Sequence, residues 1–402
     1  MLNTPFSPWP SFSETEAELA KNILLSNKVN YWTGKECREF ETEFEHFTGS
    51  KYAIALANGT LALDLAMVAL NIGKGDEVIV TSRTFLASVS SIVNCGATPV
   101  FADVSPDTQN ITEASINSVL TNKTKAIICV HLAGWPCDMD EIMLLSKQKN
   151  LVVIEDCAQA HGAQYKGKSV GSIGDVGCWS FCQDKIMTTG GEGGMVTTDN
   201  EQLWKKMWAY KDHGKSYDAI YNKQHAPGFR WLHESFGTNW RMTEIQGAIG
   251  RYQLKKMPEW TALRNQNQNR IWQVCSELRG LRVPNLRCAS CLICDGNNKC
   301  THAAYKAYVF IKANELNEGW TRDKIIDAIN EEGVPCYSGS CSEVYLEKAF
   351  DNTTFRPDKR LSMAKQLGES SLMFLIHPTL SDSEIDLTCI TIKKVMFQAA
   401  AQ

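Results

Sequence analysis

Two charged residues in this sequence follow apolar runs that have the composition of buried β-strands. Asp156 ends the run VVIED, and Lys185 comes shortly after GCWSF, in a stretch with no amphipathic period. Ligands of an open α/β sheet collect beyond the carboxyl ends of its strands, and a buried carboxylate there needs a partner. A lysine in a crowded apolar pocket can act as an amine nucleophile and base. The simpler interpretations are that Asp156 caps the segment after it and that Lys185 is a solvated surface residue.

Further residues have the chemistry to hold a phosphate or an aromatic ring. The triplet NGT at 58–60 separates an expected strand from an expected helix, so backbone N–H groups and the Thr60 hydroxyl can bind phosphate there. Ser180 offers a second hydroxyl, and Phe85 can stack on a ring unless it belongs to the core. A pyridoxal-phosphate (PLP) site needs a lysine for the Schiff base, an acid facing the pyridine nitrogen and phosphate donors. The combined set predicts PLP as the cofactor.

The elements that must position these residues alternate in type between residues 52 and 199. Short β-branched runs such as YAIALA, EVIVTS, TPVFADV and AIICVHLA predict strands. The stretches at 61–70, 85–94 and 138–147 have helical length. Such alternation predicts parallel βαβ units covered by helices, and therefore an α/β fold.

A second domain is expected toward the C-terminus. A mostly helical stretch at 240–278 follows the first α/β pattern, and AYKAYVFI then starts another one. The predicted organisation is a large domain with a mainly parallel sheet at 1–265, including the N-terminal segment, and a smaller C-terminal α/β domain at 266–402.

An ordered series of motifs covers nearly the whole chain. Its members are FETEF, ALANGTLALDLA, GDEVIVTSRTFLAS, GATPVFADV, VHLAGWPCDMD, VIEDCAQAHGAQYKGKSVGSIGDVGCWSF, DKIMTTGGEGGMVTTD and FGTNWRMTEIQGAIG. Each motif alone is a weak match, but the ordered set is highly specific. It resembles the DegT/StrS-type nucleotide-sugar aminotransferases, which implies the fold-type I PLP-dependent transferase fold.

The resemblance implies a role for each matching residue. Lys185 would form the Schiff base and carry the proton in the 1,3-shift, and Asp156 would keep the pyridine nitrogen protonated. The other cofactor contacts would be Gln159 near the ring, Phe85 on its face, and Gly59, Thr60 and Ser180 on the phosphate.

Asn239 carries the implication for assembly. It matches the asparagine that family members insert into the phosphate site of the neighbouring subunit, which implies a homodimer with shared active sites. The alternative is that Asn239 caps a helix that begins near Arg241 in its own chain. The segment FCQD before Lys185 departs from the commoner family form, so the resemblance does not say what lies on the substrate side of the cofactor.

The implied activity is transfer of an amino group, with glutamate as donor, to the keto group of a nucleotide-linked deoxysugar. Such amino sugars serve polysaccharides, including lipopolysaccharide. Two alternatives stay open: a PLP-dependent sugar dehydratase on the same fold, in which relatives replace the lysine by histidine, and a non-catalytic regulator with this fold. The sequence does not identify the sugar, the nucleotide or the pathway. It also does not say whether C3 or C4 of the sugar is aminated.

Charge and hydropathy exclude some partners. The net charge is −4 and no run of Lys or Arg stands out, so no nucleic acid is expected. No apolar stretch reaches the length of a membrane span, and the N-terminal residues lack the pattern of a signal peptide. We therefore expect no membrane association and a cytoplasmic location.

A cysteine cluster lies in RCASCLICDGNNKCTH. Its members are Cys288, Cys291, Cys294 and Cys300. The CxxC spacings are typical of metal sites, but a zinc ribbon needs a second, distant pair, and a reduced cysteine-rich loop is the alternative. His302 matches a family position and is discounted as a ligand. Whether the four cysteines bind a metal stays open, and no metal is assigned to the site.

Overall fold

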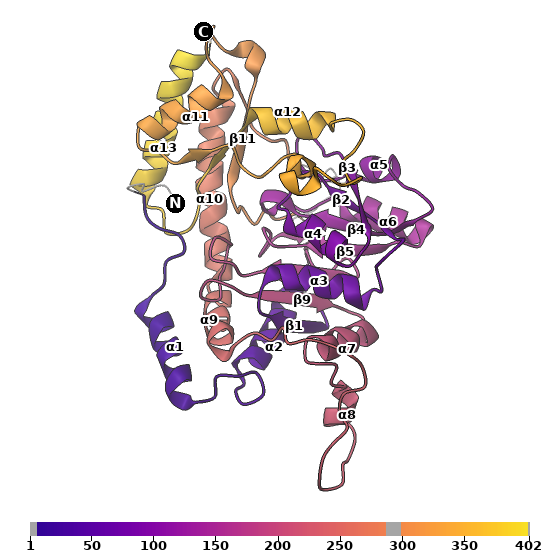
Figure 1. Ribbon diagram of the computed structural model, residues 1–402. Helices are drawn as coiled ribbons and strands as arrows, with labels where there is room; N and C mark the ends of the chain where they lie inside the picture. Colours follow the sequence, from indigo (N-terminus) through magenta and orange to yellow (C-terminus); the bar gives the residue numbers. More distant parts are fainter. Residues whose placement is uncertain (1–5, 287–298, 401–402) are drawn as a thin grey trace.

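The computed structural model describes residues 6–286 and 299–400. Its larger domain contains a seven-stranded sheet with the order β1-β9-β8-β5-β4-β2-β3 (Figure 1). The strands are β1 (Tyr52–Leu56), β2 (Glu77–Thr81), β3 (Thr98–Ala102), β4 (Thr124–Val130), β5 (Val152–Asp156), β8 (Val176–Ser180) and β9 (Gly194–Thr198). Strand β9 runs antiparallel to both neighbours, and the other pairs are parallel. The predicted α/β fold with a mainly parallel sheet is confirmed.

Helices cover both faces of this sheet because successive side chains of its strands point to opposite sides. In β1, Ile54 belongs to one buried apolar cluster and Ala55 to another. The first face is covered by α3 (Gly59–Ala69), α4 (Ala87–Asn94) and α7 (Glu201–Tyr210). The second face is covered by α2 (Glu36–Thr48), α5 (Glu113–Asn117), α6 (Met139–Lys149) and α9 (Glu244–Leu254).

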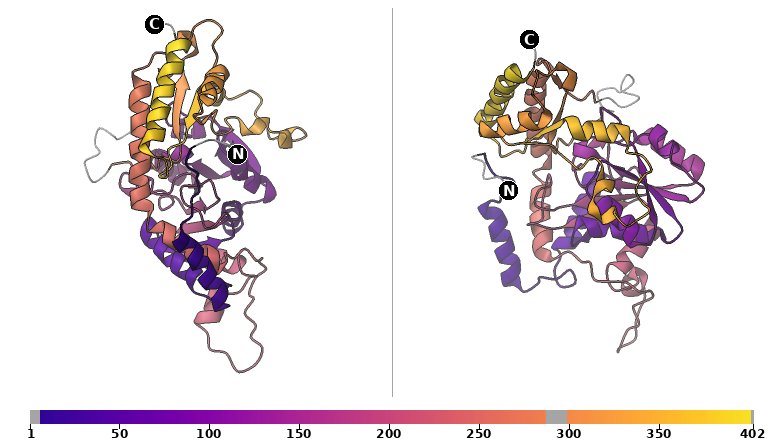
Figure 2. Two further views of the ribbon diagram at one scale, coloured as in Figure 1. Left: turned by 90° about the vertical axis from the view of Figure 1, so that its left-hand side faces the viewer. Right: turned by 45° about the horizontal axis from the view of Figure 1, so that its top comes forward.

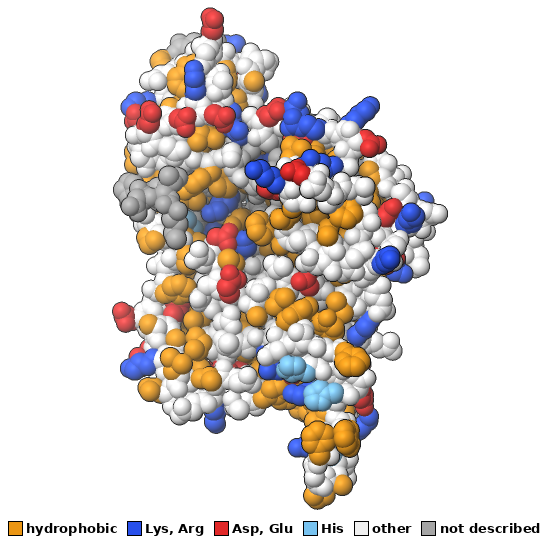
Figure 3. Space-filling model, viewed as in Figure 1, with side chains coloured by type: hydrophobic (Ala, Val, Ile, Leu, Met, Phe, Trp, Pro, Cys, Tyr) orange, Lys and Arg blue, Asp and Glu red, His pale blue; other side chains and the backbone are white. Residues whose placement is uncertain are grey.

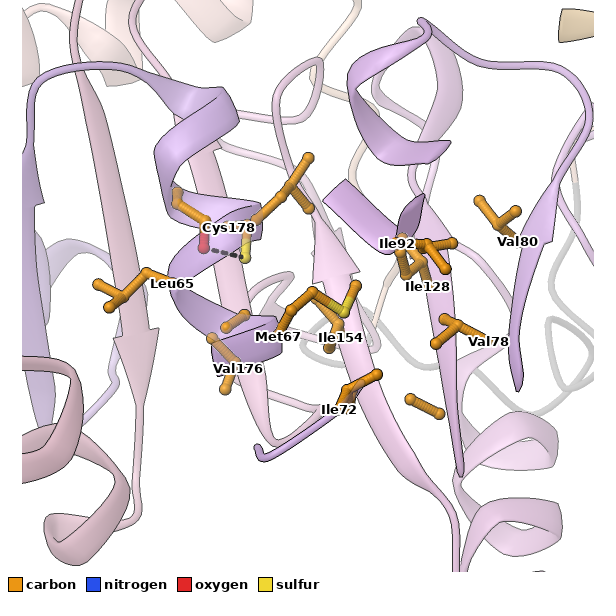
Figure 4. Packing of buried hydrophobic residues seen from close by; sticks show 14 of the residues in the cluster. Leu65, Met67, Ile72, Val78, Val80, Ile92, Ile128, Ile154, Val176 and Cys178 are labelled. Atoms are coloured by element: carbon orange, nitrogen blue, oxygen red, sulfur yellow. Dashed lines mark hydrogen bonds between the residues drawn. The ribbon is translucent and has the colours of Figure 1, made fainter. Parts of the chain in front are cut away.

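Helix α3 packs at the centre of the first face. Figure 4 shows Met67 of this helix beside Val176 of β8 and Ile154 of β5. The thiol of Cys178 donates a hydrogen bond of 3.4 Å to the carbonyl oxygen of Ala62 in α3. This contact holds the helix directly over the strands whose ends form the cavity described below.

The smaller domain contains a four-stranded antiparallel sheet with the order β10-β11-β13-β12. Its elements are β10 (Leu281–Arg282), β11 (Ala307–Ile311), α11 (Arg322–Glu331), β12 (Cys336–Tyr337), α12 (Ser362–Ser370), β13 (Ser371–Phe374) and α13 (Asp382–Ala399). Helix α10 (Met257–Ser276) runs from the large domain into this one (Figure 1). Phe6 joins the core of the small domain. The boundary after residue 265 stays a prediction, and it falls inside α10.

The expected elements differ from the observed ones mainly at their ends. The helical stretch expected at 240–278 is two helices, α9 and α10, with Pro258 in the first turn of the second. The helix expected from 85 begins at Ala87, which leaves Phe85 outside it in a loop. The first and last residues of a helix depend on local hydrogen bonds, which the spacing of apolar residues in the sequence does not reveal.

A long arm projects from the large domain. Residues 215–237 include the short helix α8 (Tyr217–Tyr221) and extend away from the body of the molecule in every view (Figures 1 and 2). Its base is tied down by a hydrogen bond of 2.8 Å from the backbone N–H of His213 to the carbonyl oxygen of Thr238. Helix α1 (Glu14–Ser26) lies near the N-terminus. Within residues 6–286 and 299–400, no helix combines the length and apolar character needed to cross a membrane.

Candidate active site

A cavity of about 820 Å³ lies where the two domains meet at the carboxyl ends of β5 and β8. The small domain contributes Tyr305, Lys306 and the segment 339–341 to its wall. Seven of the eight residues predicted for the site line it: Gly59, Thr60, Phe85, Asp156, Gln159, Ser180 and Lys185. Strands, loops and a helix end that are far apart in the sequence thus converge on one space.

The N-terminus of α3 forms one end of the cavity. Asn58 caps the helix, since its side-chain oxygen accepts a hydrogen bond of 3.0 Å from the N–H of Leu61. A Cβ atom on Gly59 would stand 2.4 Å from the Cβ of Ser180. Only a glycine lets the helix end approach β8 this closely. The unpaired N–H groups of the first turn, with the Thr60 and Ser180 hydroxyls beside them, are a set of donors suited to a phosphate.

Asp156 is a buried carboxylate whose two oxygens both accept hydrogen bonds. Oδ2 accepts 2.7 Å from the Ser88 hydroxyl, and Oδ1 accepts 3.1 Å from the N–H of Ala158. Burial raises the pKa of Asp156, and these two hydrogen bonds oppose that rise. The local bond to Ala158 is the capping contact considered above, but it uses only one oxygen. A cationic partner in the cavity would favour the charged carboxylate.

Lys185 lies in the wall of the cavity and is not a solvated surface residue, because only 18% of its side chain is exposed. Its Nζ stands 3.1 Å from Oδ2 of Asp184, and the same oxygen accepts a hydrogen bond of 2.6 Å from the Tyr305 hydroxyl. Burial alone would raise the pKa of Asp184, but Lys185 and Tyr305 outweigh it and lower that pKa. The Trp9 indole donates to the carbonyl oxygen of Lys185 at 2.8 Å.

Two predicted ring contacts have defined positions. The side-chain oxygen of Gln159 accepts a hydrogen bond of 2.8 Å from the N–H of Ala133, which orients its amide at the cavity wall. Phe85 is 73% exposed and lines the cavity, so the alternative that it packs in the core is wrong. An aromatic ring that faces a cavity is available to stack on a planar ligand.

Asn239 is the predicted residue that the described structure leaves outside this cavity. It is exposed at the base of the arm and pairs with Asp212 through the backbone. The next helix, α9, begins at Glu244 and is capped by Thr243, whose side chain forms a capping box with Gln246. The alternative that Asn239 caps this helix is therefore wrong.

Sequence reasoning missed several cavity residues. Ser88, which donates a hydrogen bond to Asp156, follows Phe85 by three positions, and nothing in the surrounding sequence distinguishes it as a site residue. Asp184 and Cys182 belong to the unusual FCQD segment, which places a thiol and a carboxylate beside Lys185. Tyr305 and Lys306 come from the small domain, and no local pattern in the sequence predicts that they line this cavity.

The possible metal ligands divide into two groups. Cys288, Cys291 and Cys294 lie outside the described residues, while Cys300 is half-buried. His302 is buried, and its Nδ1 accepts a hydrogen bond of 2.9 Å from the N–H of Ala304. A second group, His131 with Glu155, is hydrogen-bonded internally at 3.0 Å, and Glu155 also accepts from backbone N–H groups of residues 171–174.

The residues of the cavity fit PLP. The glycine-lined helix end can accommodate a phosphate, the buried Asp156 can face a protonated ring nitrogen, and Lys185 presents an amine to the same cavity. The fold and this cavity define a fold-type I PLP-dependent aminotransferase. The chain belongs to the DegT/DnrJ/EryC1/StrS aminotransferase family, whose sequence model matches residues 10–393.

Individual relatives agree with this assignment. The solved aminotransferase from Psychrobacter cryohalolentis is 64% identical, with a TM-score of 0.94, and the match covers 97% of this chain and 98% of that one. GDP-perosamine synthase from Escherichia coli O157:H7 is 42% identical over 96% of both chains. Spr1654 of Streptococcus pneumoniae, solved in its PLP form, is 26% identical with a TM-score of 0.84, covering 98% and 99%.

The close approach of Gly59 to Ser180 gives a first prediction. In Gly59→Ala the new methyl group must displace Ser180 or the helix end, so the affinity for PLP is expected to fall by about tenfold, the effect of losing one charge-assisted hydrogen bond. Equilibrium dialysis of PLP against the apoenzyme measures it. Gly73→Ala is the control, since its Cβ would meet only the carbonyl oxygen of Cys95, at 3.4 Å. Equal PLP affinity in both variants would contradict the assignment of this helix end to the phosphate.

Proposed function

We propose that this protein transfers an amino group from glutamate to the keto group of a nucleotide-linked deoxysugar, for amino-sugar and polysaccharide biosynthesis. The observation that carries the proposal is the amine of Lys185 in a cavity that also holds Asp156 and the N-terminus of α3. The family and the name of the relative that is 42% identical support a sugar nucleotide as the acceptor.

Each cavity residue has a proposed task. Lys185 holds the cofactor covalently and moves the proton at its Nζ, while Asp156 keeps a proton on the ring nitrogen. Phe85 and Gln159 hold the ring, and the phosphate donors are Gly59, Thr60 and Ser180. When bound, PLP supplies the electron sink for the proton shift. The lysine at position 185 and the intact donor set favour transamination over the dehydratase and over a regulator without catalysis.

We further propose a homodimer in which each subunit completes the other's site. The arm exposes three large aromatic residues, Phe229 by 80%, Trp231 by 85% and Phe236 by 99%, and hydrophobic side chains gather on this projection in Figure 3. Exposed apolar surface of this kind is typical of an interface. Asn239 lies at the base of the same arm and away from its own cavity, which is the position that a residue serving the partner's phosphate site requires.

The function is tested by turnover on a panel of 3-keto and 4-keto sugars linked to GDP, dTDP and UDP. With L-glutamate, one member of the panel should yield an aminated sugar and an equal amount of 2-oxoglutarate, both measured by mass spectrometry. Deoxygenation of the sugar with no glutamate consumed would favour the dehydratase instead.

Lys185 is tested with borohydride. Reduction of the holoenzyme should fix the cofactor on Lys185, which peptide mapping locates. Lys185→Ala should lose both the covalent label and turnover, because the proposed covalent link and the proton transfer both use the Nζ of Lys185. If a different lysine carries the reduced cofactor, the site assignment is wrong.

Asp156→Asn tests the acid. The substitution preserves volume but removes the charge that keeps the ring nitrogen protonated, so turnover should fall by orders of magnitude while PLP still binds. Rates and cofactor content are compared with Asp358→Asn, which changes an exposed acid. Turnover near the wild-type level would show that Asp156 serves only as a structural cap.

The shared site is tested by mixing two inactive variants, Lys185→Ala and Asn239→Asp. The added carboxylate of the second should repel the phosphate. In a mixed dimer, one site receives both defects and the other receives neither. Random exchange of subunits in a symmetric dimer should therefore restore about a quarter of wild-type activity.

Differently tagged subunits show whether exchange has occurred. Exchange without recovery of activity would mean that Asn239 acts within its own chain, and the shared site would have to be withdrawn.

A further inference from the structure

Lys306 is a second lysine in the active-site cavity, and the cofactor chemistry proposed above does not use it. It comes from the small domain, just before β11, and lines the same cavity as Lys185. The Nζ atoms of Lys306 and Lys185 stand 5.1 and 5.7 Å from the centre of the same ring, that of Tyr305. The two ammonium groups therefore share one region of the cavity.

Within residues 6–286 and 299–400, the side chain of Lys306 makes no hydrogen bond or ion pair. Its described polar contact is a cation–π contact with the Tyr305 ring. The nearest acid, Asp184, already binds both Lys185 and the Tyr305 hydroxyl. Burial lowers the pKa of Lys306 to about 8, and the neighbouring buried guanidinium of Arg264 adds to that effect. Lys306 is half-buried as a residue, and an ammonium group that is drawn out of water without a carboxylate partner is costly unless a ligand supplies the anion.

The position of Lys306 limits which anion can reach it. The residue lines both the large cavity and a much smaller one of about 10 Å³, which is bounded by Leu132, Trp135 and Tyr308 among others. Lys306 thus lies at the edge of the large cavity, next to a space of about the size of one water molecule. A terminal group such as a carboxylate can reach a lysine at such an edge. A diphosphate, bonded on one side to a sugar and on the other to a nucleoside, needs open space on both sides.

We propose that Lys306 binds a carboxylate of the amino donor. This inference rests on the proposed function, in which glutamate and the sugar nucleotide use the same cavity in turn. The donor's amino group must come to Lys185, and its two carboxylates lie one bond and about 4 Å from the carbon that bears that group. Either carboxylate stays within the region that the two lysines share. The ammonium of Lys306 would then be paired only while the donor is bound.

The direct test is dicarboxylate binding to the holoenzyme. Maleate has two carboxylates and no amino group, so it probes the anion site without turnover. Its Kd, measured by calorimetry, should rise about tenfold in Lys306→Met, as expected for loss of one charge-assisted hydrogen bond. Lys306→Arg keeps the charge and should recover most of the affinity. Lys147→Met, an exposed lysine on α6, is the matched control and should leave Kd unchanged.

A second measurement separates the two substrates. The apparent affinity for L-glutamate in a single half-reaction should fall with that for maleate, while Kd for GDP and UDP should stay at the wild-type value. Unchanged maleate binding in Lys306→Met would overturn the proposal. Weaker nucleotide binding with normal maleate binding would overturn it too, and would assign Lys306 to the diphosphate.

If Lys306→Met fails to retain PLP, Lys306→Gln replaces it in the same titrations.

Two outcomes keep this inference separate from the proposed function. Wild-type protein that binds maleate through Lys306 but transfers no amino group would refute the proposed function and leave the carboxylate site standing. If the protein transfers amino groups but Lys306→Met binds maleate as well as the wild type, the proposed function stands and the carboxylate site is refuted.

Discussion

The close contact between the N-terminus of α3 and the ends of β8 and β9 is the constraint on which the site depends. A Cβ atom on Gly59 would stand 2.4 Å from the Cβ of Ser180, and one on Gly194 would stand 2.3 Å from the carbonyl oxygen of Asn58. Neither position has room for a Cβ atom, so the helix end lies directly on the strands. That geometry directs its N–H groups into the same cavity as Asp156 and Lys185.

A hydrogen-bonded group joins the two domains across this cavity. Asp184 of the large domain accepts from Lys185 beside it and from the Tyr305 hydroxyl of the small domain. The carboxylate therefore orients the amine and also fixes the small domain against the large one. Trp9, near the N-terminus, adds a third distant segment by bonding to the backbone of Lys185. The amine is positioned by groups from three parts of the chain.

Much of the large domain could be predicted from the sequence, because its strands are β-branched runs separated by helical stretches. Asp156 and Lys185 are predictable as site residues for the same reason, since each lies at or after the end of such a run. Strands β10 and β12 have two residues each, too few for a periodic signal. Tyr305 lies 121 positions after Asp184, so its role depends on how the domains meet and not on any local pattern.

Helix α10 has a consequence for how the molecule unfolds. Met257 and Trp260 in its first turn belong to a core of the large domain, whereas Ile271 and Cys275 near its end belong to the core of the small one. If either domain lost its core, one half of this continuous helix would lose the residues it packs against. Partial opening of one domain therefore removes packing partners from the helix that the other domain also uses, so α10 couples the stability of the two domains that form the cavity.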